Sequence, residues 1–298
     1  MGSLSDNALG AIFMMVSMAA FVINDTLMKL VSAELFLFQA IFLRGLLASA
    51  LLVLVAYRRG ALRPKLAASD RKLILLRMAA EIGATTCFLT ALFNMPIANA
   101  TAILQSMPLA VTLAAALFLG EHVGWRRYTA ITVGFTGVIV IVQPGSEGFT
   151  VYSLWALAAV GFMVVRDLTT RRMTRALPSI FVALTTSIGI TVVSGLVSAV
   201  QPWAPVWGQT AALLALAAGF LIVGYLFNVM AMRRGEIGFV SPFRYTILLW
   251  AMVLGAIVFG DVPDVMMLAG SAIVVVTGVY TFYRERRLRL RSAGPLVR

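Results

Sequence analysis

Long apolar runs separated by short polar segments are the dominant pattern of this 298-residue chain. An apolar run of about 20 residues spans a bilayer as an α-helix, and ten such runs follow one another here. The runs are continuously apolar, whereas the strands of a membrane barrel alternate apolar and polar residues. The pattern therefore predicts an all-α membrane protein with ten transmembrane helices, near residues 8–30, 36–57, 72–93, 97–119, 126–143, 151–166, 179–200, 210–232, 237–259 and 264–283.

Basic residues predict the orientation of these helices. Of the 24 Lys and Arg residues, 20 fall in one set of alternate loops and in the C-terminal tail, at residues 58–72, 126–127, 166–175, 233–234 and 284–298. The opposite loops hold only Lys29, while Arg44, Arg77 and Arg244 lie inside expected helices. Because Lys and Arg concentrate on the cytoplasmic side, both termini are predicted to be cytoplasmic. An even number of helices agrees with this prediction, since it places both termini on the same side of the membrane.

Composition supports a membrane protein and excludes a water-soluble domain. The chain is 61% hydrophobic and 12% charged, whereas a soluble domain carries about half apolar and about a quarter charged residues. The formal net charge of +12 would favour a nucleic-acid partner in a soluble protein. Here the basic residues form short clusters between apolar runs, so we expect a lipid bilayer as the partner and no nucleic acid.

Several chemical functions lack their motifs. Cys87 is the only cysteine and His122 the only histidine, so neither a disulfide nor a cysteine-based zinc site is expected. The phosphate-binding pattern G-x-x-x-x-G-K-[ST] and the hydrolase patterns H-E-x-x-H and G-x-S-x-G do not occur. We therefore expect no metal, no cofactor, no ATP-driven pump and no enzyme. An intramembrane enzyme or a membrane scaffold remains as an alternative, although the loops are too short for an interaction module.

The chain resembles itself at an offset of about 140 residues, a feature of repeat architectures. The repeats predicted from this match are residues 1–145 and 146–285, followed by a basic tail at 286–298. Five helices per half is an odd number, so the second repeat is predicted to be inverted relative to the first. The matched positions are Asn24-Asp25 with Arg166-Asp167, Lys29 with Arg171, and Gly120-Glu121 with Gly260-Asp261.

Inverted repeats favour transport, because two similar halves of opposite orientation can open a central site first to one side and then to the other. The matched polar residues Asn24, Asp25 and Asp167 are candidate gate groups, or polar helix ends at the membrane interface. Phe36 stands where the second repeat has Pro178. It either anchors the interface or shifts the balance between gate states, since proline suits a first helical turn.

Several segments resemble the drug/metabolite transporter superfamily, specifically its EamA-type ten-helix exporters. They are Gln105-Ser-Met-Pro-Leu-Ala-Val-Thr-Leu-Ala-Ala-Ala-Leu-Phe-Leu-Gly-Glu121, Gly134-Phe-Thr-Gly137 and Phe42-Leu-Arg44-Gly45, with a degenerate second copy that includes Asp261 and Gly278. The overall similarity is greatest to bacterial aromatic amino acid exporters of the YddG type. The resemblance implies a bacterial inner-membrane exporter of small amphipathic solutes, foremost aromatic or neutral amino acids, with a central cavity walled by the first four helices of each repeat. The alternative is an exporter or importer of another metabolite or of a cationic drug. We expect the protein to function as a monomer.

Two prolines are candidate hinge residues. The resemblance places Pro108 in a cavity-lining helix, where the missing N–H permits a kink that can serve a gate. Pro242 can act similarly, or it can simply begin a helix. Gly134 and Gly137 are expected to allow close helix packing.

Charged residues inside a membrane are costly, at roughly 2.5–3.5 kcal/mol each on insertion scales, so each needs a partner. Arg77 and Glu81 are four residues apart on one expected helix and can pair. Counted from the cytoplasmic ends, Arg44 and Glu81 lie at similar depth. We therefore expect a structural charge group of Arg44, Arg77 and Glu81, with the alternative that Glu81 contacts substrate or carries a proton.

Arg244 has no carboxylate at an obvious matching depth. In an amino acid exporter it can bind the substrate carboxylate, with hydrogen bonds from Gln105, Tyr225, Asn228 and Tyr245. The alternative is that Arg244 extends to the cytoplasmic headgroups.

Overall fold

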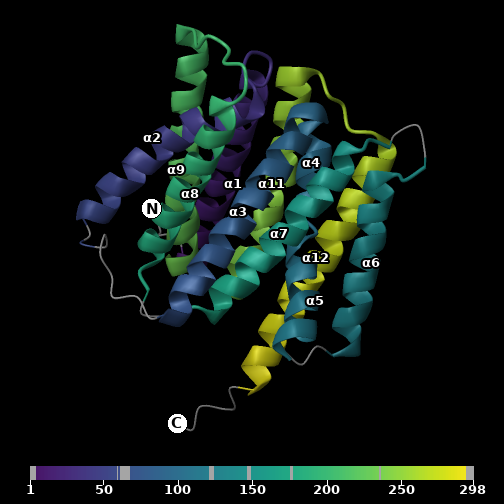
Figure 1. The fold of residues 1–298 in the computed structure, drawn as a ribbon. Helices are drawn as coiled ribbons and strands as arrows, with labels where there is room; N and C mark the ends of the chain where they lie inside the picture. The colour runs from purple at the N-terminus through teal and green to yellow at the C-terminus, as the bar shows by residue number, and fades with distance from the viewer. Residues whose placement is uncertain are drawn as a thin grey trace. The chain divides into compact units, whose positions relative to one another are not determined.

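The computed structural model describes residues 5–58, 60, 68–120, 124–145, 149–174, 177–234 and 236–292. Over these ranges the regular structure is entirely helical, without strands (Figure 1). In chain order the elements are α1 (Asp6–Val31), α2 (Leu37–Arg58), α3 (Ala68–Asn94), α4 (Ile97–Leu104), α5 (Met107–Leu119), α6 (Trp125–Val142), α7 (Tyr152–Arg172), α8 (Ser179–Ala199), α9 (Gly208–Arg234), α10 (Ile237–Val240), η1 (Ser241–Tyr245), α11 (Thr246–Leu254), η2 (Gly255–Phe259) and α12 (Val265–Ser292).

Nine segments of the described chain are long and apolar enough to cross a membrane. They include Ile97–Leu119, which joins α4 and α5, and Ser241–Phe259, which joins η1, α11 and η2. The tenth expected helix is α6, whose 18 residues begin with Trp125-Arg126-Arg127 and are therefore less apolar. The prediction of an all-helical membrane protein is confirmed.

The end of α7 was predicted too early. The hydropathy pattern stops at residue 166, but α7 continues to Arg172. Arg166 and Asp167 lie inside this helix, and the side chain of Arg166 hydrogen-bonds Asp167 and Glu81. Charged residues with polar partners can remain within a helix that a hydropathy scale would end. Likewise, α12 extends through Ser292, so the basic tail begins as helix; residues 293–298, like Glu121 and His122, lie outside the described residues.

Both proline-containing segments are interrupted. The segment 97–119 divides into α4 and α5, with Pro108 in the first turn of α5. The segment 237–259 begins with the four-residue helix α10, and Pro242 lies in the first turn of the 3₁₀ segment η1. Proline cannot donate a backbone hydrogen bond, so it is tolerated at such helix starts and not within an uninterrupted helix.

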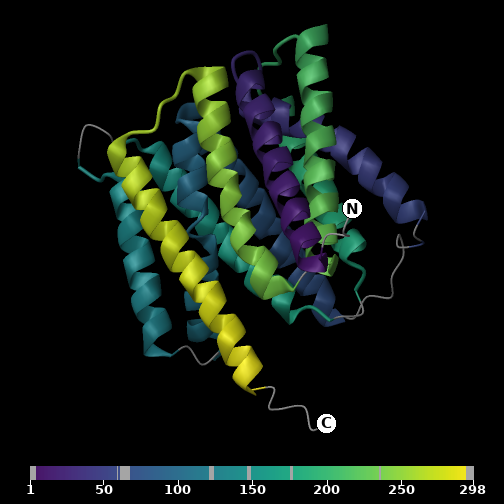
Figure 2. The same cartoon turned by 180° about the vertical axis from the view of Figure 1, so that it is seen from behind.

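The chain folds into two compact units. One comprises Met1–Val22, Ile97–Thr150 and Val223–Arg298, and the other comprises Ile23–Pro96 and Val151–Ile222. In the second unit α3 packs along α7 and α8, and α2 packs along α8. In the first, α6 and α12 lie side by side, as Figures 1 and 2 both show. The chain passes between the units within α1 and again within α9.

Glycines allow the closest helix contacts of the first unit. A Cβ atom on Gly137 of α6 would lie 2.9 Å from the carbonyl oxygen of Gly270 on α12, and one on Gly134 would overlap Leu109 of α5. Only glycine permits backbones to approach so closely. Gly120 and Gly260 end α5 and η2 with φ of 68° and 71°, the left-handed conformation that glycine adopts at little cost.

Candidate functional site

Three polar contacts join α3 to α7 and to Thr174, two residues beyond the end of α7, and form what we call the α3–α7 ladder. Asp70 accepts hydrogen bonds from the Thr174 hydroxyl at 2.8 Å and from the Thr174 backbone N–H at 3.3 Å. Seven residues later, Arg77 donates to the hydroxyl of Thr170, and four residues after that, Glu81 accepts from Arg166. Residues 70, 77 and 81 recur at helical spacing, so one face of α3 carries the ladder along its cytoplasm-proximal half in the predicted orientation.

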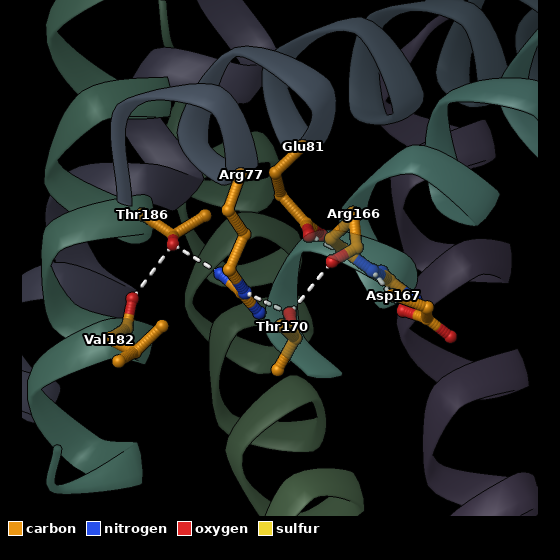
Figure 3. Close-up of polar contacts among 7 residues, drawn as sticks. All are labelled: Arg77, Glu81, Arg166, Asp167, Thr170, Val182 and Thr186. Carbon is orange, nitrogen blue, oxygen red and sulfur yellow. Dashed lines mark hydrogen bonds and ion pairs between the residues drawn. The ribbon is translucent and has the colours of Figure 1, made fainter. Parts of the chain in front are cut away.

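Glu81 and Arg166 form the ion pair of this ladder (Figure 3). One guanidinium nitrogen, Nη1 of Arg166, lies 3.3 Å from each carboxylate oxygen of Glu81, while Nε donates to Asp167 at 2.8 Å. The side chains of Arg166 and Glu81 are 20% and 15% exposed. One guanidinium is thus shared by two carboxylates in a partly buried setting, where charge-assisted hydrogen bonds are strong.

Arg77 links α3 to two other helices (Figure 3). Its Nε donates to Thr170 of α7 at 2.9 Å, and its Nη1 donates to Thr186 of α8. Each threonine hydroxyl in turn donates to a backbone carbonyl of its own helix, Thr170 to Arg166 and Thr186 to Val182. The threonine side chains are therefore held in place to accept from the arginine.

The structure adds Arg166 to the expected charge group of Arg44, Arg77 and Glu81. Glu81 pairs with Arg166, while Arg44 donates to Asn24 at 3.3 Å and Arg77 donates to threonines. A pairing of Glu81 with Arg44 or with Arg77 stays a prediction. Because α3 packs mainly along α7, the arginine nearest to Glu81 comes from α7.

A second polar cluster joins α1 to α2. The Asn24 amide donates to the carboxylate of Asp25 at 2.8 Å and accepts from Arg44. Arg166 and Asp167, which match Asn24 and Asp25 in the predicted repeats, have the same geometry: the first side chain donates to Oδ1 of the following aspartate at 2.8 Å. In each case the first residue of the pair also reaches a charged side chain on another helix.

Two contacts of side chains that the sequence did not single out hold the segment between α8 and α9 and the start of α9. The buried Gln39 side chain donates to the carbonyl of Ala204 at 2.7 Å and accepts from its N–H at 3.1 Å, and the Thr210 hydroxyl donates to Glu34. An amide side chain that pairs with both backbone groups of one residue replaces a missing backbone partner. Polar residues at a helix start are common, so no sequence signal marked them.

The expected carboxylate-binding group lies in the other unit. Gln105 occupies the turn between α4 and α5, and Arg244 lies in η1. Tyr245 is 5% exposed, and its ring packs edge-on against Phe282 of α12. Its hydroxyl is buried without a hydrogen-bond partner among the described residues. The Tyr245 ring therefore packs against α12, and its shared role with Arg244 stays a prediction.

Tyr225 and Asn228 lie on α9, beside α1. The Tyr225 ring contacts Phe21 edge-on at a centroid distance of 5.3 Å and is 53% exposed. The Oδ1 atom of Asn228 is buried without a hydrogen-bond partner in the described part of the chain. A buried amide oxygen without a partner is costly, so Asn228 has capacity for a donor from a bound solute.

Comparison with known proteins identifies the family. The model of the EamA-like transporter family matches twice, over residues 8–143 and 150–284. The chain belongs to this family. The two matches together cover most of the chain, and each includes five of the expected helices.

Named relatives of this EamA-like transporter carry different solutes. The S-adenosylmethionine uptake transporter of Rickettsia felis is 26% identical over 272 residues, which are 90% of each chain. The riboflavin transporter of Vibrio cholerae is 28% identical, covering 95% of this chain and 96% of the relative. The pseudopaline exporter of Pseudomonas aeruginosa is 26% identical, covering 90% and 93%. The family assignment is confirmed, but these relatives are not aromatic amino acid exporters.

A solved crystal structure shares the fold of this transporter. It aligns with a TM-score of 0.65 at 19% identity, covering 93% of this chain and 98% of that chain. At this identity the likeness describes the fold alone. The EamA-like transporter is thus a multi-pass helical membrane protein, and its solute has to be argued from its own residues.

Proposed function

We propose that this protein is a secondary transporter that moves a small amphipathic organic solute across the bacterial inner membrane by alternating access. The observation that carries the proposal is the double match to one transporter family, with one match in each half of the chain. Two inverted repeats with cytoplasmic termini would supply the two interchangeable halves that alternating access requires. Asn24, Asp25 and Asp167 would then be repeat-related gate groups, and Pro108 and Pro242 hinge residues.

For the solute, we propose neutral amino acids, with aromatic ones favoured, and export as the physiological direction. The S-adenosylmethionine carried by one relative is itself an α-amino acid, which supports recognition of an amino acid group within the family. The rival solutes are S-adenosylmethionine itself and riboflavin, which share a planar heteroaromatic ring. Because named relatives include both an uptake transporter and an exporter, the solute gradient and any coupled ion would set the direction.

We assign the solute carboxylate to Arg244, with Asn228, Gln105 and Tyr225 as hydrogen-bonding residues. Arginine binds carboxylates in a bidentate manner, and the buried amide oxygen of Asn228 can accept a hydrogen bond from an ammonium group. The Tyr245 hydroxyl, which is buried without a hydrogen-bond partner among the described residues, is a further candidate to bind the solute beside Arg244.

Flux into liposomes tests the function. Purified protein would be reconstituted and supplied with radiolabelled phenylalanine, tyrosine, tryptophan, methionine, threonine, S-adenosylmethionine or riboflavin, with and without an imposed pH gradient. Saturable flux of amino acids would support the proposal, and the response to the gradient would establish or exclude proton coupling. Flux of riboflavin alone would contradict an amino acid as the solute and point to a ring-bearing solute. No flux of any of these solutes by folded protein would contradict their transport.

A substitution at Arg244 separates the solute classes. Arg244→Gln should raise the half-saturation concentration of amino acids about tenfold or more, because loss of a charge-assisted contact costs about 1.5–3 kcal/mol. Riboflavin lacks a carboxylate, so its transport should not change. The exposed Arg233→Gln is the matched control. Unchanged amino acid affinity in Arg244→Gln would remove Arg244 from the binding site.

A further inference from the structure

Two phenylalanine–glycine contacts recur at the same spacing in the two halves of the chain. A Cβ atom on Gly83 of α3 would lie 2.8–2.9 Å from three ring atoms of Phe162 on α7. A Cβ atom on Gly224 of α9 would lie 2.8–3.1 Å from three ring atoms of Phe21 on α1. Gly224 follows Gly83 by 141 residues, and Phe162 follows Phe21 by 141 residues. Each contact therefore joins the first helix of one repeat to the third helix of the other.

Each contact lies at a boundary along its pair of helices. One boundary is the end of the polar ladder, and the other is the passage between the two compact units. On the α3–α7 pair, Gly83 and Phe162 adjoin the last rung of the ladder, Glu81 with Arg166. Beyond Gly83, the same face of α3 carries Cys87, one turn further and 6% exposed. On the α1–α9 pair, Phe21 and Gly224 adjoin the points at which α1 and α9 pass from one compact unit to the other, after Val22 and after Ile222.

We propose that these two contacts are the pivots about which the repeats change conformation during transport, and that Phe21 and Phe162 are the residues that position the helices at them. The proposal rests on the proposed function, since it assigns a role within alternating access. A flat ring seated on a glycine allows two helices to rotate against each other without interlocking side chains. Repeat-related pivots would work in opposition, so that one closes as the other opens.

The chain provides its own reporter for the first pivot. Cys87 is the only cysteine, and it shares the helix face of Gly83. Its repeat counterpart, 141 residues later, is Asn228. Asn228→Cys in a Cys87→Ser background therefore reports on the second pivot. The labelling rates of the two cysteines with a maleimide measure how open each helix pair is, and the measurement requires no knowledge of the solute.

The decisive variants insert one methyl group at each pivot. Gly83→Ala should raise the labelling rate of Cys87 about fivefold, because overpacking by one carbon costs at least about that factor in an equilibrium. It should also lower the labelling rate of the Asn228→Cys reporter. Gly224→Ala should produce the reverse pair of changes. Gly161→Ala on α7 and Gly219→Ala on α9 are matched controls, because a Cβ atom there meets nothing within 4 Å.

The reciprocal change separates a pivot from a purely structural contact. If the contact only stabilised the fold, its disruption would raise the labelling rate of the nearby cysteine alone, or would raise the labelling rates of both cysteines as the protein loosens. Either result would overturn the proposal. Should Gly83→Ala fail to insert, Phe162→Ala removes the same contact from α7 and should again change the two rates in opposite directions. Flux is measured on the wild-type protein, because Asn228 is itself assigned to solute binding. Reciprocal labelling without wild-type flux would retain the pivots and reject the proposed function. Flux without reciprocal labelling would retain the proposed function and reject the pivots.

Discussion

Arg166 shows how a charged side chain is kept inside an apolar helix. It has a carboxylate on its own helix, Asp167, and one on the neighbouring helix, Glu81. Removal of one member leaves the others partly buried with fewer compensating contacts, and such changes cost more than the loss of an exposed ion pair. The pair therefore joins α3 to α7 in one register, and loss of either partner is expected to destabilise the fold.

Glu81→Gln should lower both thermal stability and transport rate. The amide retains the shape of the side chain but loses the charge that Arg166 binds, so we expect a cost of about 1.5–3 kcal/mol. Melting of the purified protein in detergent, together with liposome flux, measures both effects. Lys72→Gln on the exposed surface of α3 is the control. Equal melting temperatures for Glu81→Gln and wild type would show that the ion pair adds nothing to stability.

Tyr245→Phe should stabilise the protein. The hydroxyl of Tyr245 is buried against α12 without a hydrogen-bond partner among the described residues, and burial of an unsatisfied hydroxyl is unfavourable. Its removal should add about 1 kcal/mol or more to the free energy of unfolding, visible as a higher melting temperature. An unchanged or lower melting temperature would contradict this prediction, and a lower solute affinity would support the predicted hydrogen bond from Tyr245 to the solute.

At the scale of helices, close packing depends on where glycine is placed. The α6–α12 contact runs through Gly137 and Gly270, and the Gln143 amide donates to Asp264 at 3.1 Å near its end. The α2–α8 contact instead uses small hydroxyl residues, with Ser49 and Ser187 at 2.8 Å. Both arrangements bring backbones together where lipid gives no hydrophobic driving force.

Gly270→Ala should separate α6 from α12. A Cβ atom there would lie 2.6 Å from the carbonyl oxygen of Gly137, which is fixed backbone. We expect a loss of about 1–3 kcal/mol, measured as a lower melting temperature. Gly219→Ala, whose Cβ atom meets open space, should melt within a few degrees of wild type. A similar fall in melting temperature in both variants would mean that the effect does not come from the contact between the backbones of Gly137 and Gly270 but from a change in helix propensity.

The helices could be predicted because hydropathy depends on local sequence. The interruptions near Pro108 and Pro242 follow from backbone chemistry and were likewise predictable. The pairing of Glu81 with Arg166 was not, because depth along the helices pointed to Arg44 and Arg77, and only the packing of α3 along α7 points to Arg166. The role of Gln39 was also hidden, since its backbone partner, Ala204, lies 165 residues away.

At the scale of the whole molecule, the predicted orientation has a direct test. Green fluorescent protein fused after residue 298 should fluoresce, and alkaline phosphatase fused at the same point should be inactive, because the positive-inside rule places this end in the cytoplasm. The same two fusions after Thr150, beyond five helices, should give the opposite pattern. Active phosphatase at residue 298 would show that this end lies outside the cytoplasm and that the predicted topology is reversed.

The α3–α7 ladder has a consequence for the speed of any motion that separates these helices. Its rungs at Asp70, Arg77 and Glu81 are one to two helical turns apart and use different chemical groups. Water can therefore replace these contacts one at a time, beginning at one end of the ladder. Separation then meets three small activation barriers in sequence, and a transporter built this way can combine a well-held resting state with rapid turnover.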